Sequence, residues 1–186
     1  MARLRSAAGL ALRDAELADV SLLARWRSDP RVLEFYGGRD KPLDPASVRS
    51  RYFLRRRDSV TGRFYEYRPC IVETDRGPVG FVQYYRLPWR ESALFGYAPE
   101  ERVYAVDYFI GETSLWGRGL GPRLVELVRD YLVEARSALR VVADPRVTNP
   151  RSVRSLEKAG FRKVRLLPAH EVHEGVLSDC WLMEYP

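Results

Sequence analysis

Cysteine is scarce in this chain of 186 residues, in which Cys70 and Cys180 are the only two copies. They lie far apart, show no CxxC spacing and have no dense cysteine framework around them, which excludes a disulfide scaffold. Both have strand-like apolar neighbours, so we expect buried, inert thiols and no cysteine nucleophile.

Long apolar runs are also missing, since no run approaches the roughly 18 to 20 residues that a membrane span needs. A transmembrane protein is therefore excluded. The stretch over residues 1–13 is short and broken by arginines, unlike the apolar part of a signal peptide, so we expect a cytoplasmic protein with no membrane partner. At 46% hydrophobic and 12% aromatic residues, the chain can form the core of one globular domain, predicted over residues 1–186.

Lysine is the third scarce residue type, because only 3 of the 31 basic residues are lysines and 28 are arginines. The formal charge of +6 favours an anionic partner, and nucleic acid, a phosphate-bearing cofactor or an anionic membrane would each fit. The arginines are spread along the chain without a nucleic-acid-binding motif, and the run at Arg55 to Arg57 suits the C-terminal end of a helix. No nucleic-acid partner is expected.

Apolar periodicity and turn residues predict an α/β fold with a mixed, mostly antiparallel twisted sheet flanked by helices. The predicted strands cover residues 10–12, 67–73, 79–86, 103–110, 139–143, 161–167 and 175–184. The predicted helices cover residues 14–26, 31–36 (a short helix or turn), 44–57, 120–135 and 149–159, with a polar loop over 87–102.

A glycine-rich stretch, Trp116-Gly117-Arg118-Gly119-Leu120-Gly121, stands between the strongest predicted strand and the longest predicted helix. Unpaired N–H groups and the positive end of a helix dipole meet there, which favours phosphate binding. The spacing is GxGxG rather than GxGxxG, and no Gly-Lys-Ser/Thr follows, so neither a Rossmann nor a Walker A motif fits. Alone, the stretch is equally well explained as a structural connector.

A second segment adds specificity, because Asn149 opens a helix soon after the next strand and Ser-Leu-Glu-Lys-Ala-Gly-Phe closes it at residues 155–161. Together the two segments resemble the cofactor-binding half of the GNAT superfamily of acyl-CoA N-acetyltransferases. Stretches at 32–38, 77–84 and 106–107, with Ala-Asp-Pro at 143–145, are similar to the aminoglycoside 6′-N-acetyltransferase branch. That branch also resembles acyltransferases that modify hydroxylysine during siderophore synthesis.

The resemblance implies a single GNAT domain that uses acetyl-CoA as co-substrate. It further implies that the strand ending at Ile110 pairs with the pantetheine arm and that backbone amides of the glycine-rich loop hold the pyrophosphate. The residues expected to bind acetyl-CoA are Phe109, Ile110, Trp116, Gly117, Arg118, Gly119, Leu120, Gly121, Asn149 and Arg154.

Three residues depart from the superfamily pattern. Trp116 replaces the usual Gln or Arg of the loop, and Pro122 removes one N–H at the start of the helix. Leu156 stands where many members carry a tyrosine proposed to protonate the departing thiolate. The general acid is therefore unassigned, and we expect the thiolate to leave unaided and take its proton from water.

Asp107 interrupts an apolar, β-branched strand in which an unpaired carboxylate is costly to bury. It is either a catalytic base or amine anchor, or the partner of a structural arginine. By resemblance it falls on the family's substrate-contacting aspartate, which favours the catalytic role.

The resemblance also assigns substrate contacts to Asp144, Phe35 and Tyr36. Asp144 could equally start an ordinary Asp-Pro turn, and the aromatic pair could be plain packing. The segment His170-Glu171-Val172-His173-Glu174 lacks the HExxH spacing and a third ligand, so we expect a solvated charged turn and no metal site.

These observations predict an acetyl-CoA-dependent N-acetyltransferase that modifies a primary amine of a small molecule. The 6′-amine of an aminoglycoside is the best single candidate. Two alternatives remain open: a lysine- or hydroxylysine-type acceptor, and a non-catalytic acyl-CoA-binding module, which the leucine at position 156 permits. We expect a monomer or a homodimer.

Overall fold

The computed structural model describes residues 3–186, which form one eight-stranded sheet in the order β1-β2-β3-β4-β5-β6-β8-β7. Neighbouring strands are antiparallel except β5 and β6, which are parallel because α5 connects them. The mixed, largely antiparallel sheet confirms the predicted fold class. The strands are β1 (Arg3–Ala7), β2 (Leu10–Asp14), β3 (Tyr67–Thr74), β4 (Gly77–Arg86), β5 (Val103–Ile110), β6 (Arg140–Ala143), β7 (Arg162–His173) and β8 (Val176–Tyr185).

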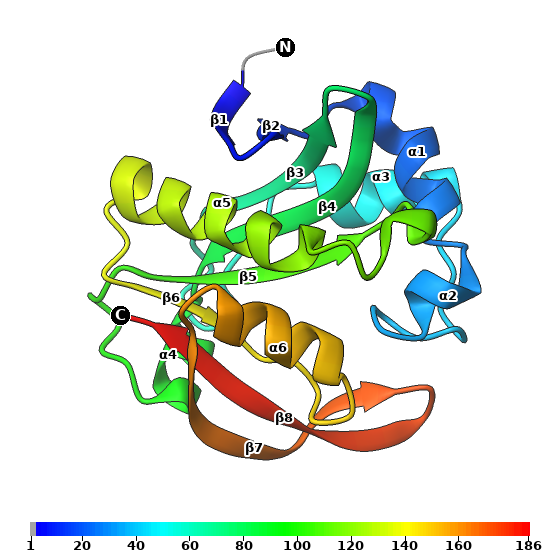
Figure 1. Cartoon of the computed structure of the whole chain (residues 1–186). Coiled ribbons are helices and arrows are strands. Elements are labelled where there is room, and N and C mark those ends of the chain that lie inside the picture. Colours follow the sequence, from blue (N-terminus) through cyan, green and yellow to red (C-terminus); the bar gives the residue numbers. More distant parts are fainter. Residues whose placement is uncertain (1–2) are drawn as a thin grey trace.

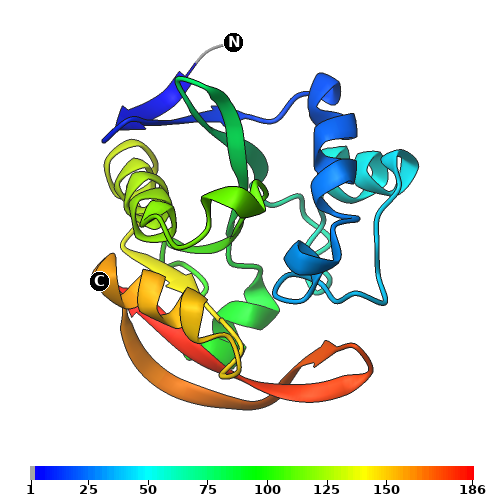
Figure 2. The same ribbon diagram turned by 45° about the vertical axis from the view of Figure 1, so that its right-hand side comes forward.

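Helices cover both faces of the sheet, with α5 and α6 on one face and α1 and α3 on the other (Figures 1 and 2). The α-helices are α1 (Val20–Trp26), α2 (Pro30–Leu33), α3 (Pro45–Phe53), α4 (Trp89–Phe95), α5 (Leu120–Arg136) and α6 (Pro150–Lys158). Two 3-10 turns, η1 (Leu17–Asp19) and η2 (Thr113–Leu115), precede α1 and α5. No helix within residues 3–186 is long and apolar enough to cross a membrane.

The alternation of side chains along β5 divides it between two cores. Tyr104 and Val106 pack in the cluster under α5 and α6, whereas Phe109 packs in the cluster under α1 and α3. Because successive residues of a strand point to opposite faces, Asp107 and Tyr108 also point to opposite faces. This alternation determines which side of the site each of the two polar residues can reach.

The sheet opens between β5 and β6, and this opening positions the site. The two strands pair only over Val103–Ala105 on β5 and Arg140–Val142 on β6, after which they separate. Residues 106–110 of β5 stay paired with β4 on the other side. Within residues 3–186, the edge of β5 over residues 106–110 that faces away from β4 therefore pairs with no strand and is free to receive an extended ligand.

The start of the first helix differs from the prediction of a helix that begins at Asp14. Asp14 ends β2, and Glu16 caps the 3-10 turn η1 with a capping box in which the carboxylate of Asp19 accepts from the N–H of Glu16. The carboxylate of Asp19 also pairs with buried Arg13 at 2.7 Å. The helix begins at Val20, because the residues before it already use their polar groups in the turn.

The third helix ends earlier than the predicted Arg57. It stops at Phe53, and Leu54 is extended. The guanidinium carbons of Arg55 and Arg57 lie 3.9 and 4.0 Å from the ring centroid of Phe64, which is bridged to Arg57. Stacking on this ring, rather than a helix C-terminus, accounts for the position of these arginines.

Three further segments correct the sequence-based assignment. Strand β1 was not predicted, and the predicted loop over 87–102 contains α4, which ends at Gly96 in a left-handed conformation. The predicted charged turn at 170–174 is wrong for residues 170–173, because β7 continues to His173 and pairs there with Val176 of β8. Only Glu174 and Gly175 form the turn.

Candidate active site

The glycine-rich loop places backbone amides at the N-terminus of α5. Gly117 and Gly119 have φ angles of +77° and +75°, and Gly119 is the N-cap of this 17-residue helix. A Cβ atom on either residue would meet no heavy atom within 4 Å, so the left-handed backbone rather than crowding requires glycine here. Gly121 differs, because its Cβ would lie 2.7 Å from Ser155 Oγ on α6. The loop is therefore both curled around an open space and packed closely on α6.

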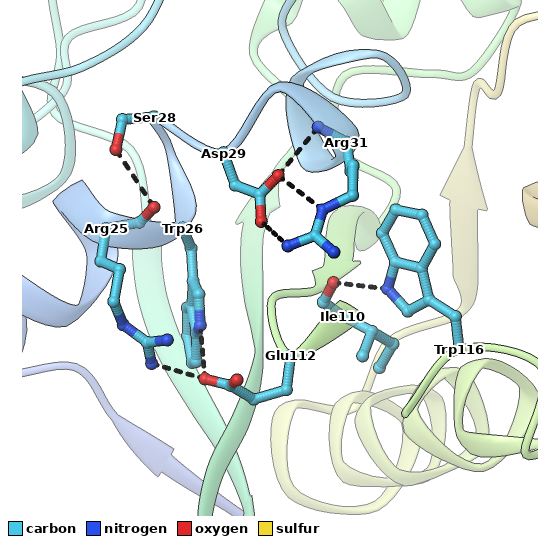
Figure 3. A network of polar contacts seen from close by, with 8 residues as sticks. All are labelled: Arg25, Trp26, Ser28, Asp29, Arg31, Ile110, Glu112 and Trp116. Atoms are coloured by element: carbon cyan, nitrogen blue, oxygen red, sulfur yellow. Dashed lines mark hydrogen bonds and ion pairs between the residues drawn. The ribbon is translucent and has the colours of Figure 1, made fainter. Parts of the chain in front are cut away.

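Trp116 fastens this loop to the end of β5 (Figure 3). Its indole N–H donates to the carbonyl of Ile110 at 2.9 Å. Its ring packs edge-on against Phe35 at 6.0 Å, and Arg151 of α6 lies 5.5 Å from it. Where the superfamily pattern has a polar residue, this chain thus has a tryptophan that packs the loop against the aromatic pair at 35–36.

A second anchor holds the chain just beyond β5 against α1 (Figure 3). The carboxylate of Glu112 accepts from Arg25 Nη2 at 2.5 Å and from the indole N–H of Trp26 at 2.9 Å. These bonds hold the pKa of Glu112 below its usual value, chiefly through Arg25. Gly111 lies flat on the Trp26 ring, since a Cβ there would approach the ring within 2.2 Å. These contacts with α1 fix the position of the turn that leads into the glycine-rich loop.

A cleft of about 510 Å³ runs from the open edge of β5 along the glycine-rich loop to α6. Arg151, Arg154 and Lys158 of α6 line it, and no carboxylate does among the described residues. Asn149 caps α6, its side-chain oxygen accepting from the N–H of Ser152 at 3.1 Å. The cleft is cationic and bordered by helix N-terminal amides, which suits a phosphate-bearing ligand.

Nine of the ten residues predicted to bind acetyl-CoA line this cleft. Arg118 does not line it and is exposed. The nine are Phe109, Ile110, Trp116, Gly117, Gly119, Leu120, Gly121, Asn149 and Arg154. The structure therefore brings both halves of the sequence motif to one place, although they lie about 30 residues apart in the chain.

A second cavity, of about 320 Å³, adjoins the cleft on the other side of the β5 edge. Three carboxylates, on Asp107, Asp144 and Glu171, line it together with the guanidinium groups of Arg51 and Arg146. Arg146 is buried, lies 3.7 Å from Glu171 and donates to the carbonyl of Glu34. We call this cavity the acidic pocket.

Asp107 lies in the wall of the acidic pocket and is partly buried there. Its carboxylate accepts from the side-chain amide of Gln83 at 2.5 Å, and Gln83 accepts in turn from the hydroxyl of Tyr67 at 2.7 Å. Among residues 3–186 no arginine or lysine forms an ion pair with it within 4 Å, so the structural-arginine interpretation does not hold. Burial, and secondarily the charge of Asp144, raises the pKa of Asp107 to about 7.

Asp144 occupies the opposite wall and pairs with His170. The two side chains meet at 3.0 Å between Asp144 Oδ2 and His170 Nε2, and the ring of Phe95 lies 5.8 Å from the imidazole. The hydrogen bond to Asp144 raises the pKa of His170. Asp144 is therefore part of the pocket rather than only the start of a turn, and His170 is a pocket residue that the sequence did not reveal.

Five residues within the described part of the chain line both the cleft and the acidic pocket, and thus mark where the two meet: Phe35, Tyr36, Tyr108, Asn149 and Ser152. The aromatic pair predicted to wall an acceptor pocket is among them. Tyr108 was not predicted. Its hydroxyl lies 3.1 Å from the hydroxyl of Ser152.

Comparison with known proteins agrees with this geometry, because residues 15–168 match the acetyltransferase (GNAT) domain family. The chain belongs to the GNAT acetyltransferase family. Aminoglycoside N(6′)-acetyltransferase type 1 of Klebsiella pneumoniae is 26% identical over 147 residues, which cover 78% of this chain and 70% of that protein.

Solved GNAT structures share the fold. Aminoglycoside acetyltransferase AAC(6′)-Ib in complex with coenzyme A and kanamycin superposes with a TM-score of 0.72 at 22% identity, covering 95% of this chain and 94% of that one. Spermidine N-acetyltransferase from Vibrio cholerae, in complex with CoA and spermine, gives a TM-score of 0.74 at 17% identity, covering 95% of each chain.

As a GNAT member, this protein is an acetyl-CoA-dependent N-acetyltransferase, and the cationic cleft fits its co-substrate. Leu156, at the superfamily's tyrosine position, is fully buried in the core under α5 and α6. It offers no polar group to the reaction, which confirms that the chain lacks an acid there.

The two cysteine thiols lie outside this site. Cys70 and Cys180 are free and buried, and burial raises the pKa of the Cys180 thiol to about 12, so both thiols are inert as predicted. Within residues 3–186, no group of three or more His, Cys, Asp and Glu side chains could hold a metal ion.

Proposed function

We propose that this GNAT enzyme acetylates a primary amine of a small molecule, with the 6′-amine of an aminoglycoside as the leading acceptor. The observation that carries the proposal is Asp107, a carboxylate that has no ion-pair partner among residues 3–186 and lines the acidic pocket beside the open edge of β5. The similarity to the Klebsiella pneumoniae aminoglycoside acetyltransferase supports the choice of acceptor.

Asp107 acts in this proposal as the base that takes a proton from the attacking amine. A pKa of about 7 suits that task, because about half of the Asp107 carboxyl groups are ionised at neutral pH and the carboxylate is basic enough to accept a proton. Gln83 and Tyr67 orient the carboxylate through a chain of hydrogen bonds. Asp144, Phe35 and Tyr36 contact the acceptor, and the paired state of Asp144 with His170 limits how much of its charge the acceptor meets.

Acetyl-CoA supplies the activated acetyl group, and the chain's own residues hold it. The free edge of β5 up to Phe109 and Ile110 pairs with the pantetheine arm, and amides between Trp116 and Gly121 hold the pyrophosphate. Arg154 and Asn149 contribute from α6. Arg118, which is exposed and does not line the cleft, contributes to the local positive charge only at longer range.

A lysine- or hydroxylysine-type acceptor is the second candidate, and the guanidinium groups of the acidic pocket favour it. Arg51 and Arg146 line the pocket with the three carboxylates. Such an acceptor carries a carboxylate as well as an amine, and a guanidinium is the side chain best suited to bind it. A polycationic aminoglycoside would gain nothing from either arginine.

The deciding experiment measures thiol release from acetyl-CoA with a panel of kanamycin, spermidine, lysine and N6-hydroxylysine. We expect kcat/KM for kanamycin to exceed that for the other amines by at least about tenfold, which corresponds to roughly 1.4 kcal/mol of transition-state binding. A preference for lysine or hydroxylysine would transfer the proposal to the second candidate. CoA binding without thiol release for any amine would instead establish the non-catalytic acyl-CoA-binding module.

We further propose that residues 1–186 act as one domain and that the protein works in the cytoplasm, where free cysteines such as Cys70 and Cys180 stay reduced. The single eight-stranded sheet, from β1 at one edge to β7 at the other, supports the first point. A monomer or homodimer stays a prediction, which sedimentation of the purified chain would test.

A further inference from the structure

We propose that the hydroxyl of Tyr108 is the hydrogen-bond donor that stabilises the thiolate leaving acetyl-CoA, in place of the tyrosine that is missing at position 156. This inference rests on the proposed amine acetylation at the same site. It assigns a catalytic residue on β5 to a step for which this chain has no group at the superfamily's usual position, since Leu156 is fully buried.

Tyr108 lies where the two cavities meet. The C–S bond of acetyl-CoA must break where the cleft and the acidic pocket meet, because the thioester lies in one and the amine arrives from the other. Tyr108 lines both cavities. Its hydroxyl lies 3.1 Å from Ser152 Oγ and donates to the Ser152 carbonyl oxygen at 3.4 Å, so it is directed toward α6 and the cleft.

Side chains along β5 alternate between the two faces of the sheet. Asp107 and Tyr108 are consecutive residues, and consecutive side chains of a strand point to opposite faces. Asp107 accepts from Gln83, which in turn accepts from Tyr67 on the α1 and α3 side, whereas Tyr108 contacts Ser152 on the α6 side. A substrate lying along the free edge of β5 would therefore meet a proton acceptor on one side and a hydroxyl donor on the other.

Among the hydroxyl groups at the junction, Tyr108 is the best placed to donate to the sulfur. Of the residues that line both cavities, Tyr36, Tyr108 and Ser152 carry hydroxyl groups. The Tyr36 ring packs on Phe109 at 4.8 Å under the Arg27 guanidinium, on the α1 and α3 side. Ser152 is better placed as the partner of Tyr108, because its hydroxyl can donate to the phenol oxygen at 3.1 Å. The phenol proton, which Tyr108 donates to the Ser152 carbonyl at 3.4 Å, then turns from that long bond to sulfur as the thiolate forms.

The chemistry balances without any added reactant. The amine nitrogen forms a bond to the carbonyl carbon and gives one proton to Asp107, the C–S bond breaks, and its electron pair goes to sulfur. Burial raises the pKa of Tyr108 to about 12, well above the reference thiol value of about 8.5. Tyr108 therefore keeps its proton and stabilises the thiolate by hydrogen bonding, and the proton that Asp107 accepted returns to sulfur through solvent.

The test compares wild type with Tyr108→Phe on acetyl-CoA and on the acetyl selenoester of CoA. A selenolate is a better leaving group and needs less stabilisation. With acetyl-CoA we expect kcat to fall about 10- to 100-fold, at or below the cost of losing one oxyanion donor, with CoA affinity unchanged. With the selenoester the same substitution should lower kcat by less than about threefold, because the lost interaction matters less to that transition state.

Tyr104→Phe is the matched control. Tyr104 lies on the same face of β5 and donates its hydroxyl to Glu66 at 2.8 Å, away from both cavities. The turnover of Tyr104→Phe should equal that of wild type both with acetyl-CoA and with the acetyl selenoester of CoA. Equal losses for Tyr108→Phe with the thioester and the selenoester would make Tyr108 a structural residue and overturn the proposal, as would full activity with acetyl-CoA.

The slow hydrolysis of acetyl-CoA in the absence of amine provides an independent arm, because water then attacks and the same C–S bond breaks. If wild type acetylates none of the amines in the panel, the proposed function fails, while the thioester-to-selenoester comparison on hydrolysis still decides the role of Tyr108. A loss confined to the thioester would support the assignment there as well.

Discussion

At the scale of single residues, the site depends on a carboxylate kept less acidic than usual. Burial raises the pKa of Asp107, and the hydrogen bond from the neutral amide of Gln83 lowers it less than a cation would. Replacing Gln83 with a positive residue would acidify the group, and removing the group would abolish base catalysis. The environment of Asp107 thus matches the role of an acceptor of one proton at neutral pH.

Asp107→Asn keeps size and hydrogen bonding but removes the basic oxygen, so we expect acetyl transfer to fall roughly 100-fold or more. In wild type, kcat/KM should rise with pH through an inflection near 7, where Asp107 loses its proton. The measurement is turnover of a confirmed acceptor from pH 5 to 9, with the pKa of that amine determined separately. Near wild-type turnover in a folded, CoA-binding variant would remove Asp107 from the mechanism.

The same substitution should stabilise the protein at pH 8. The pKa of Asp107 is about 7 in the folded state and about 4 in the unfolded chain, so the folded state binds more protons between these values. The free energy of unfolding of wild type therefore decreases as pH rises from about 4 to 7. Asp107→Asn lacks this loss, and we expect its Tm to exceed that of wild type by several degrees at pH 8 and to match it near pH 4. A lower Tm of the variant at pH 8, measured by calorimetry, would contradict the raised pKa.

Individual site residues were predictable where the superfamily motif names them. Asp107 stood out in an apolar strand, and nine cleft residues followed from the two motif segments. Tyr108 and His170 were missed for a physical reason: each reaches the site only because β5 and β6 separate and because β7 extends past Leu167. Neither event leaves a local pattern in the sequence.

At the scale of elements, the site consists of the glycine-rich loop, the free edge of β5 and the N-terminal end of α6, and specific contacts fix their relative positions. Trp116 ties the loop to β5, Glu112 ties the segment after β5 to α1, and the bare Cα of Gly121 lets α5 approach α6. Between these ties, the left-handed glycines Gly117 and Gly119 line the cleft.

Gly119→Asp should abolish CoA binding without unfolding the protein. The substitution adds a negative charge at the anion site and strains a φ of +75°, which together should weaken CoA affinity at least about 100-fold. Gly62→Asp is the matched control, because Gly62 also has a left-handed backbone and open space around it but lies in the loop after α3. Titration calorimetry of both variants makes the comparison, and equal affinities would exclude the loop as the pyrophosphate site.

Element prediction succeeded where periodicity was strong and failed where pairing or capping decides. The strand Val103–Ile110 was predicted with its exact bounds, and α5 extends one residue beyond its predicted end. Strand β1 was missed because it is largely polar and exposed, and it forms only by pairing with β2 across a turn in which Ala8 and Gly9 both have positive φ. Helix α4 is a short helix without a clear apolar period, ended by Gly96.

At the scale of the whole molecule, the two cavities carry different charge. Basic residues of α6 line the cleft, whereas the acidic pocket holds three carboxylates and two arginines. Since the open edge of β5 separates them, an anionic co-substrate and a cationic amine can each approach along a favourable potential.

Saturating CoA should therefore raise the Tm of the whole protein. A ligand that binds only the folded state at 100 times its Kd adds about 2.7 kcal/mol to the free energy of unfolding. For a chain of this size that corresponds to roughly 5 to 10 °C. Differential scanning calorimetry with and without CoA measures the shift, and its absence at millimolar ligand would contradict the cleft assignment.

Phe35 lines both cavities and packs on Trp116, so a ligand in one cavity would share this ring with a ligand in the other. Thermodynamic linkage then requires reciprocity: whatever factor CoA contributes to the affinity for the amine, the amine must return to CoA. Any coupling between the affinities of the two substrates therefore passes through one shared ring, and enzyme and co-substrate together, rather than the free enzyme, define the acceptor's binding surface.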